Sequence, residues 1–446
     1  MLESDALTAE RIDALTQERA AGKFGSGAAN TTKPAAGWVG SRVLSTFDDW
    51  EPAVATDPGA PYEYLLTTRY GVDAPGCASK CPSPFIALTS SADGGTTWDT
   101  QRALCLCLGS KGQFDPIIEV VPNTGVVYAA FMNGDRHDGF STVFTKSTDH
   151  GKTWSPPVHV YGNVSWTDKD ELATSASGRD VYVSFNGPQG GDLYVAQSHD
   201  YGATWTQQHL SDGKRYYYAY DARVLGDGTV VFSESSLQYS GKTNVTGEVW
   251  HHAVISRDRG ATWTDTVVAK VPLAELCIAD GCKPDYYEGQ TSVVSDKPGH
   301  LVFAYEGPVV DGGPQRVYIA TSGDNGRTWS AGTPISVAGE NALGPRLASY
   351  GGDVRMWYMQ TANGDDPDAW NVWYRTSTDG GQTWTAPLKL DDAPPGAAGY
   401  VNASGFDEVY GDYGEIGVTN TGKTLATWGE GFSYTGPGGT WFNLQR

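Results

Sequence analysis

The segment Ser198–Trp205 (SHDYGATW) is one of six copies of a single eight-residue phrase in this chain, and all six fit the pattern S-x-D-x-G-x-T-W. The other five copies are Ser91–Trp98, Ser147–Trp154, Ser256–Trp263, Ser322–Trp329 and Ser377–Trp384. Their aspartates are separated by 56, 51, 58, 66 and 55 residues. A fixed phrase at near-constant spacing indicates one supersecondary unit copied along the chain. A unit of this length suits a four-stranded propeller blade and is too long for a helical hairpin.

The residues of this phrase, which we call the repeated turn, are those of a tight connection between two strands. Its aspartate accepts hydrogen bonds from nearby backbone N–H groups. Its glycine allows a positive φ that a Cβ atom would oppose. Thr and Trp then begin the next strand, where β-branched and aromatic residues pack well, and we expect the Trp side chains to lie between neighbouring blades. Because turn chemistry accounts for the aspartates, we interpret the repeated turns as scaffold rather than as a catalytic or metal site.

The inner strands of the blades predict how many blades there are. An inner strand followed by a second strand can be recognised seven times, but the seventh set, which ends with Thr440–Leu444, has no repeated turn and no fourth strand. The segment 41–46 (SRVLST) alternates correctly and can supply the missing strand, which would close the ring and remove its exposed edges. We therefore predict an all-β, seven-bladed propeller over residues 39–446, with six blades as the alternative. Residues 1–38 are predicted to be a short helix (5–22) and a linker.

The repeated turn resembles the Asp-box, or BNR, repeat, and the resemblance runs from Trp50 to nearly the C-terminus. It implies a sialidase-like β-propeller, a superfamily of secreted glycan-active proteins. Sialidases carry an Arg-Ile-Pro motif on the first inner strand, an arginine triad, an Asp acid/base and a Tyr–Glu nucleophile pair. The corresponding strand here has Glu51 in place of the arginine, so the resemblance does not extend to sialic acid as the substrate. The segment 409–413 (VYGDY) resembles the place of the nucleophilic tyrosine and makes Tyr410 a candidate.

Composition narrows the class of partner and the compartment. The formal net charge is −21, from 31 basic and 52 acidic residues, which argues against nucleic acid or an anionic membrane as a partner. No apolar run approaches the length of a membrane span. The first five residues (MLESD) do not resemble a secretory leader, so we interpret the chain as a mature secreted form and expect a monomer.

The six cysteines fall in three close pairs, and no cluster of Cys and His completes a set of four zinc ligands. An even count in a chain of secreted type favours disulfides. We predict that Cys277 and Cys282 close a local loop and that the other four, Cys77, Cys81, Cys105 and Cys107, staple the first blade with unassigned connectivity. Sequons at Asn30, Asn163, Asn244 and Asn402 are compatible with a glycoprotein.

The functional residues are expected on the face opposite the repeated turns, where the inner strands begin. The first residues of these strands are predicted to form a ring around the channel mouth: Glu51, Asp115, Asp170, Asp221, Glu288, Arg346 and Asp412. Packed carboxylates repel one another unless they hold a cation or share protons. One interpretation is a hard cation such as Ca²⁺ in the channel, with Asp170 and Asp412 among its ligands. The other is that Asp115, Asp221 or Glu288 supplies the acid and base of glycoside hydrolysis.

Aromatic and basic side chains are expected on the same face. Five aromatic residues are candidates for stacking on sugar rings, although such residues also serve as ordinary packing: Trp50, Trp166, Tyr218, Tyr220 and Tyr287. His137 lies in the run Asp135-Arg136-His137-Asp138 and is a candidate general acid or base. Arg69, Arg136 and Arg346 could grip a carboxylate by bidentate hydrogen bonds.

These features leave three classes of function. The first is a sialidase-like hydrolase acting on terminal sugars of acidic glycans, slightly favoured by the ring of carboxylates and needing no cofactor for catalysis. The second is a polysaccharide lyase, with His137 or a tyrosine as base and an arginine that neutralises a uronate carboxylate. The third is a non-catalytic glycan-binding propeller.

Overall fold

The structure is a computed structural model that describes residues 34–45, 47–135, 139–162, 164, 167–187, 191–240, 244–274, 289–361, 370–391, 413–431 and 438–446. Every regular element within these ranges is a β-strand, and none of them forms a helix able to cross a membrane. The predicted N-terminal helix lies outside the described residues.

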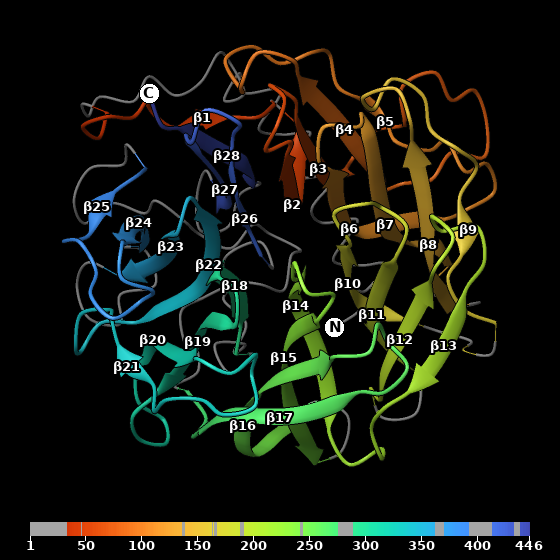
Figure 1. Ribbon diagram of the computed structural model, residues 1–446. Helices are drawn as coiled ribbons and strands as arrows, with labels where there is room; N and C mark the ends of the chain where they lie inside the picture. Colours follow the sequence, from red (N-terminus) through yellow and green to blue (C-terminus); the bar gives the residue numbers. More distant parts are fainter. Residues whose placement is uncertain are drawn as a thin grey trace.

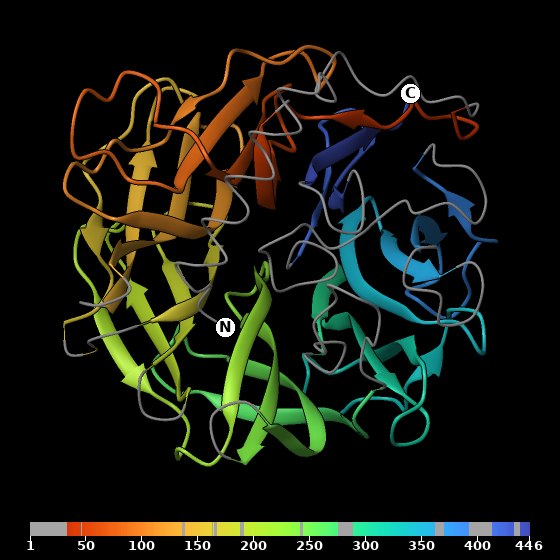
Figure 2. The same ribbon diagram turned by 180° about the vertical axis from the view of Figure 1, so that it is seen from behind.

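The strands form seven four-stranded antiparallel sheets, which confirms the seven-bladed prediction over the six-bladed alternative. Figures 1 and 2 show the sheets arranged as a ring around a central axis, from opposite sides. Blade 1 contains β2 (Asp48–Thr56), β3 (Glu63–Tyr70), β4 (Phe85–Ser91) and β5 (Arg102–Ala103). Blade 2 contains β6 (Gly112–Val121), β7 (Val126–Asp135), β8 (Gly139–Ser147) and β9 (Val158–His159). Blade 3 contains β10 (Asp168–Thr174), β11 (Val181–Asn186), β12 (Leu193–Ser198) and β13 (Thr206–His209).

The remaining blades follow the same order from the axis outward. Blade 4 contains β14 (Tyr216–Val224), β15 (Val230–Ser240), β16 (Asn244–Ser256) and β17 (Thr264–Val271). Blade 5 contains β18 (Thr291–Lys297), β19 (His300–Pro308), β20 (Gln315–Ser322) and β21 (Thr333–Pro334). Blade 6 contains β22 (Ala342–Tyr350), β23 (Asp353–Thr361), β24 (Trp370–Ser377) and β25 (Leu388–Lys389). Blade 7 contains β26 (Glu415–Val418), β27 (Thr424–Gly431), β28 (Gly438–Leu444) and, as its outermost strand, β1 (Arg42–Val43).

The N-terminal strand closes the ring as predicted. In blade 7, β1 pairs antiparallel with β28, with Arg42 opposite Phe442 and Val43 opposite Trp441. The contact between the two ends of the chain extends beyond β1 and β28. Trp38 forms an isolated β-bridge with Gln445 and is only 1% exposed. The first and last described segments therefore share one sheet, which leaves no open seam between blades 1 and 7.

Each repeated turn joins the third and fourth strands of its blade, and its hydrogen bonds are those expected for an Asp turn. In the third copy, Asp200 accepts bonds from the backbone N–H of Thr204 (2.8 Å) and from its hydroxyl (2.6 Å). The Ser198 hydroxyl accepts a bond from the N–H of Gly202 (2.9 Å), whose φ is +76°. These bonds lower the pKa of Asp200 to about 2. Its tryptophan, Trp205, contacts Phe144 of the preceding blade with ring centroids 5.2 Å apart, as expected for a residue between blades.

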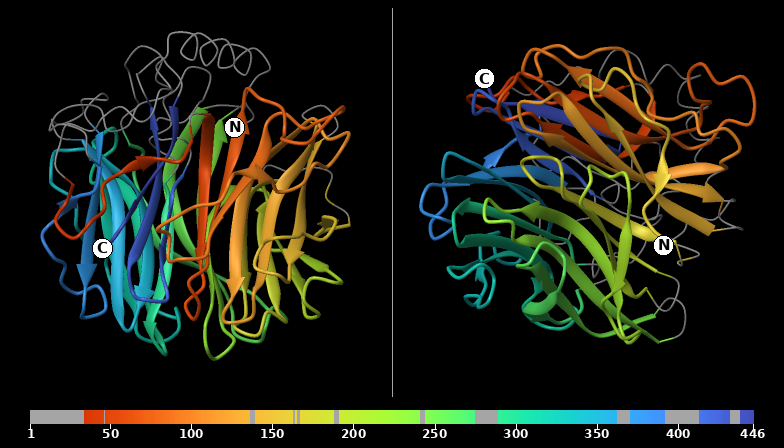
Figure 3. Two further views of the ribbon diagram at one scale, coloured as in Figure 1. Left: turned by 90° about the horizontal axis from the view of Figure 1, so that it is seen from above. Right: turned by 45° about the vertical axis from the view of Figure 1, so that its right-hand side comes forward.

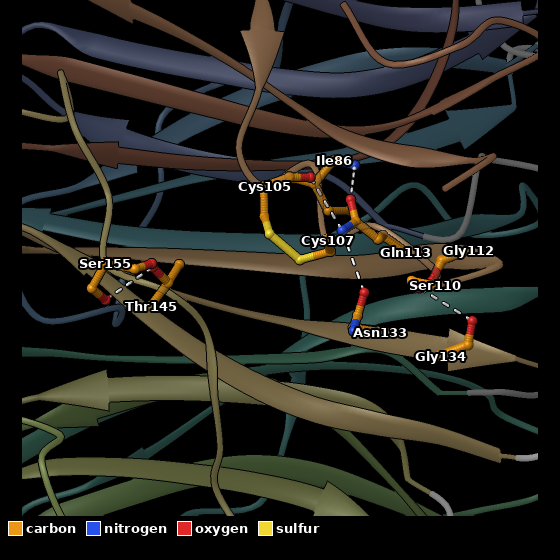
Figure 4. The surroundings of a disulfide bond; sticks show 10 residues. All are labelled: Ile86, Cys105, Cys107, Ser110, Gly112, Gln113, Asn133, Gly134, Thr145 and Ser155. Carbon is orange, nitrogen blue, oxygen red and sulfur yellow. Dashed lines mark hydrogen bonds between the residues drawn. A yellow bond between two sulfur atoms is a disulfide. The ribbon is translucent and has the colours of Figure 1, made fainter. Parts of the chain in front are cut away.

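Two disulfides are present in the described part of the chain, Cys77–Cys81 and Cys105–Cys107. Both lie in the connections of blade 1, the blade that the sequence predicted them to staple, and each closes a local loop. Figure 4 shows Cys105–Cys107 beside Gln113, whose Oε1 accepts the Ile86 N–H (2.9 Å) and so ties blade 2 to blade 1. The predicted pair Cys277 and Cys282 lies outside the described residues.

Candidate functional site

The inner strands converge on the axis, and five of them carry a β-bulge near the face opposite the repeated turns, which we call the upper face. The register shifts lie between Trp50 and Ala53, Phe114 and Ile117, Asp168 and Glu171, Ala219 and Asp221, and Leu343 and Arg346. A bulge re-aims the side chains that follow it. The strands begin further toward the upper face than the sequence predicted, so the expected ring residues lie within strands rather than at their first positions. Figure 3 (left) shows the strands of neighbouring blades standing side by side.

The bulges of two blades hold acidic residues in the left-handed region of backbone conformation. Glu51 and Asp115 have φ values of +54° and +50°, and Lys169, at the bulge of blade 3, has +49°. Such conformations cost free energy for residues other than glycine and are found preferentially at functional sites. Glu51 Oε2 accepts the Asp115 N–H (3.0 Å) and the Thr68 hydroxyl, so this carboxylate links the bulges of blades 1 and 2.

A small cavity lies at the upper end of the channel, where side chains from several blades meet. Its volume is about 10 Å³, which is about the space for one water molecule. Its ionisable and hydroxyl-bearing lining residues are Asp115, Lys169, Asp170, Glu171, Tyr220, Arg346, Tyr413 and Glu415. The fold therefore brings three predicted ring residues, Asp115, Asp170 and Arg346, around one cavity.

Asp170 differs from its neighbours because it is buried without a partner. It is 3% exposed, and neither of its carboxyl oxygens has a hydrogen-bond partner. Burial raises its pKa well above the ordinary value, its own backbone amide and the charge of Lys169 oppose this rise, and the negative charges of Asp168 and Glu51 add to it. The shift favours the protonated form of the carboxyl group, which is the form required of a proton donor.

The metal prediction also involved Asp170. The described residues contain no group of three or more His, Cys, Asp or Glu side chains arranged to hold a metal ion. The second expected ligand, Asp412, lies outside them, so a channel calcium ion stays a prediction.

Asp221 and Arg346 are engaged in holding the inner strands together. Asp221 forms an ion pair with Arg223 (2.5 Å) and accepts the Val293 N–H (3.0 Å), which joins blade 4 to blade 5. The Nε of Arg346 donates to the Gly414 carbonyl (2.6 Å) beside the last inner strand, and the residue is 1% exposed. Asp221 has the contacts of a structural residue, not of a catalytic acid or base open to substrate.

Arg69 is occupied in the same way. Its guanidinium makes two hydrogen bonds to Asp49, at 2.7 and 2.9 Å, and lies 4.4 Å from the Phe47 ring centroid. Only 3% of the residue is exposed. A bidentate pairing of this kind uses the geometry that a substrate carboxylate would require.

The described aromatic candidates are buried rather than displayed. Trp50, Tyr218 and Tyr220 are 0%, 3% and 4% exposed. Tyr218 and Tyr220 of β14 lie in one core cluster that includes residues of blade 5. The hydroxyl of Tyr218 bonds that of Tyr239 (2.8 Å). As they lie, these residues contribute packing and offer no open ring face to a sugar.

The remaining predicted site residues lie outside the described ranges: Arg136, His137, Trp166, Tyr287, Glu288, Tyr410 and Asp412. Their roles stay predictions. Sequence reasoning missed Lys169, Glu171 and Glu415, which line the cavity, whereas Tyr413 belongs to the segment 409–413 that it singled out. The bulge between Asp168 and Glu171 displaces Lys169 and Glu171 from the positions that a regular strand would give them.

Below this cavity the channel widens toward the repeated-turn face into a space of about 340 Å³. Glu119, Glu171, Glu415 and Arg223 line it among mostly small apolar residues. Burial raises the pKa of Glu119 to about 8 and that of Glu415 to about 7, and raises that of Glu171 well above its ordinary value. Glu119 and Glu415 therefore titrate near neutral pH.

Blade 4 also contains a Ser–His–Asp arrangement outside the channel. Ser236 Oγ lies 2.7 Å from His252 Nε2, and His252 Nδ1 lies 2.7 Å from Asp265 Oδ1. These distances match those of a catalytic triad. However, Ser236 is 0% exposed and its Oγ also accepts a bond from Arg215 Nε (2.6 Å), so no substrate can reach it as it lies. We interpret the arrangement as a structural hydrogen-bond network.

Comparison with known proteins finds partial sequence similarity to two curated enzymes and a shared fold with solved structures. No family model matches the chain. Over 286 residues, 55% of its length, it is 27% identical to a sialidase of Bacteroides fragilis (strain YCH46), of which the match covers 48%. Over 289 residues, 58% of its length, it is 28% identical to a xyloglucanase of Paenibacillus sp, of which the match covers 24%. The chain thus spans less than half the length of either of these curated relatives.

One solved structure shares the fold over nearly the whole chain. It is a polysaccharide lyase of family PL25, an ulvan lyase bound to -[GlcA(1-4)Rha3S]-, with a TM-score of 0.55 and 13% identity. The superposition covers 91% of this chain and 94% of the lyase and shows a common architecture only. The chain is thus similar to a sialidase and a xyloglucanase over just over half of its length, and it shares its propeller architecture with the lyase.

Proposed function

We propose that this protein is a secreted enzyme that hydrolyses glycosidic bonds at terminal sugars of acidic glycans. The observation that carries the proposal is Asp170, a buried carboxyl group with no hydrogen-bond partner and a raised pKa at the channel mouth. Glycoside hydrolysis requires such a group to protonate the leaving oxygen. The curated relatives are named as a sialidase and a xyloglucanase, which agrees with hydrolytic chemistry. The two disulfides agree with an oxidising, extracellular compartment.

Hydrolysis also needs a second group that attacks the anomeric carbon or activates water. Tyr413 lines the same cavity as Asp170, and Glu415, two residues later, has a pKa raised to about 7 that suits a proton acceptor. Lys169 Nζ lies 5.7 Å from the Tyr413 ring centroid, where its positive charge would stabilise a phenolate. We therefore assign Tyr413 as nucleophile, with Tyr410 as the candidate that the sequence supplied.

Substrate must approach this group from the upper face, because the cavity itself is too small for a sugar ring. Lys169 and Arg346 are the cationic residues that line the cavity. Arg346 is engaged with the Gly414 carbonyl, so Lys169 is the residue that would supply a local positive charge for the carboxylate of an acidic sugar. The proposed reaction places the glycosidic oxygen next to Asp170 and the anomeric carbon toward Tyr413.

The test of the acid is an Asp170→Asn variant assayed on two substrates. We expect the rate constant kcat for a natural glycan to fall by about 10²–10⁴-fold, the usual contribution of general acid catalysis. The loss should be much smaller for a nitrophenyl glycoside, whose leaving group needs no protonation. Asp212→Asn, at an exposed position paired with Lys214, is the matched control and should keep full activity. Equal losses on both substrates would refute the assignment of Asp170 as general acid.

The two tyrosines and the histidine are tested separately. Tyr413→Phe is expected to remove activity, and Tyr410→Phe and His137→Ala test the residues that the sequence predicted. Each variant should keep the thermal melt of the parent protein. Full activity in Tyr413→Phe would eliminate it as nucleophile, and full activity in both of the other variants would eliminate the sequence-based site.

The second candidate function is a polysaccharide lyase, favoured by the presence of Tyr413 beside Lys169 and Arg346 in one cavity. In β-elimination, a tyrosine can remove the proton next to a uronate carboxylate that a cation or a protonated acid neutralises. An unsaturated product absorbing near 235 nm would establish the lyase, and reducing ends released without that absorbance would establish the hydrolase. Glycan binding without an unsaturated product and without released reducing ends would support the third class, a non-catalytic glycan-binding propeller.

A further inference from the structure

A cleft at the outer edge of the ring, between blades 2 and 3, is separate from the channel. Its volume is about 380 Å³, within the usual range of small-molecule sites. One wall follows β9 of blade 2 and includes His159, Tyr161 and Gly162. The other wall is the third repeated turn and the start of β13, with Trp205 and Gln207.

Hydrogen bonds hold the residues of both walls of this cleft in place. Gln207 Oε1 accepts the Gly162 N–H (3.0 Å), which joins blade 3 to blade 2 across the cleft. The Trp205 indole donates to the Gly202 carbonyl (3.1 Å), and the Tyr161 hydroxyl donates to the Phe140 carbonyl (3.3 Å). Both aromatic side chains are therefore held in place before any ligand arrives, which lowers the entropic cost of binding.

The chemistry of the lining is unusual for this chain. None of the nine residues lining the cleft is Asp, Glu, Lys or Arg, although the chain has 31 basic and 52 acidic residues. The lining instead combines two aromatic rings with an imidazole, a hydroxyl and an amide. Aromatic surface with neutral polar groups suits a ligand that carries many hydroxyl groups and no charge. None of these nine side chains carries a permanent positive charge with which a uronate or sulfated sugar could pair.

We propose that this cleft binds an uncharged segment of a glycan chain, as a site distinct from the one at the channel mouth. A long glycan bound there would be held at the perimeter of the ring. The inference concerns binding only, so it does not depend on Asp170 or on the reaction at the channel mouth.

The test uses a position at which the copies of the repeated turn carry side chains of different size and charge. Ala203 lines the cleft at the sixth residue of its copy, where the other copies have Thr96, Lys152, Ala261, Arg327 and Gln382. Ala203→Arg therefore fills the cleft with a residue that the turn accepts elsewhere. Ala261→Arg makes the same change in the next copy, away from the cleft, and is the matched control. His159→Ala is a second variant, which removes the imidazole from one wall of the cleft without adding bulk.

Binding of cellohexaose, mannohexaose and xyloglucan oligosaccharides is measured by saturation-transfer NMR and calorimetry. All proteins carry Asn163→Gln, so that no glycan is attached at the sequon next to Gly162. We expect the parent to bind at least one neutral oligosaccharide, with affinity at least fivefold weaker in Ala203→Arg and in His159→Ala and unchanged in Ala261→Arg. Cleavage of a short substrate should stay unchanged in Ala203→Arg. No binding by the parent, or equal binding by Ala203→Arg and Ala261→Arg, would overturn the proposal.

Discussion

Glu234 provides the sharpest test of how burial controls ionisation in this propeller. It lies on β15 at the seam between blades 3 and 4 and is 0% exposed. Its Oε1 accepts the Ser184 hydroxyl (2.6 Å), while Oε2 has no hydrogen-bond partner. Burial raises the pKa of Glu234 from 4.5 to about 8, and the nearby charge of Asp265 adds to the effect.

The direction of the effect of pH on folding stability depends on whether the folded or the unfolded state binds more protons. Between pH 4.5 and pH 8 the folded protein keeps the Glu234 proton and the unfolded chain loses it, so stability falls as pH rises through this range. At about 1.4 kcal/mol for each pKa unit, the full effect is about 5 kcal/mol, of which about 3 kcal/mol falls between pH 5 and pH 8. Glu234→Gln removes the titration and with it this slope. The side-chain amide of the new glutamine has an N–H group without a partner, which lowers the free energy of unfolding of the variant by about 1–3 kcal/mol, equally at every pH.

The measurement is the free energy of unfolding in urea at pH 5 and pH 8, for the parent, Glu234→Gln and the exposed control Glu248→Gln. We expect the stability of Glu234→Gln relative to the parent to increase by about 3 kcal/mol from pH 5 to pH 8. The control should follow the parent. Parallel pH curves for the parent and Glu234→Gln would show that the carboxyl group is not held protonated, and the reasoning applied to Asp170 would lose its basis.

Three further predictions concern the scaffold. Ser236→Ala should lower the free energy of unfolding by about 1–3 kcal/mol because buried partners lose a hydrogen bond, with glycan cleavage unchanged; a loss of activity beyond tenfold at unchanged stability would contradict a structural role. Trp38→Ala should cost about 3–5 kcal/mol in urea unfolding, since this buried side chain anchors the ring closure, and a cost below about 1 kcal/mol would contradict that role. Asp200→Asn should lower the melting temperature at pH 7. The melting temperatures should converge as the pH falls through about 2, because the lowered pKa of Asp200 confers stability only while the carboxyl is ionised; a constant difference at all pH values would contradict this origin.

Much of the architecture follows from the sequence because it depends on local chemistry and on spacing. The hydrogen bonds around Asp200 join residues no more than four positions apart, so the residues of the repeated turn are sufficient to determine its conformation. The closure of the ring by an N-terminal strand was predictable for a different reason. Blade 7 lacked a fourth strand, an open sheet edge is unfavourable, and the segment 41–46 had the alternation needed to fill it.

For the candidate site, the sequence predicted a face of the propeller and a ring of residues. Asp115, Asp170 and Arg346 do meet at one cavity, but the functions of the ring residues depend on partners far away in the sequence. Asp221 is held by Val293, 72 residues away, and Arg346 by Gly414, 68 residues away. No local pattern reports such contacts.

The sequence by itself determined the repeating unit, the seven blades, the closure and the side of the ring on which chemistry is expected. The tertiary structure decided which carboxyl group is buried without a partner and which are engaged in joining blades. It also brought Lys169 and Tyr413 to the cavity through bulges and through the meeting of distant strands. The physical reason is that turn geometry is set by neighbours along the chain, whereas the ionisation and accessibility of a side chain are set by everything packed around it in space.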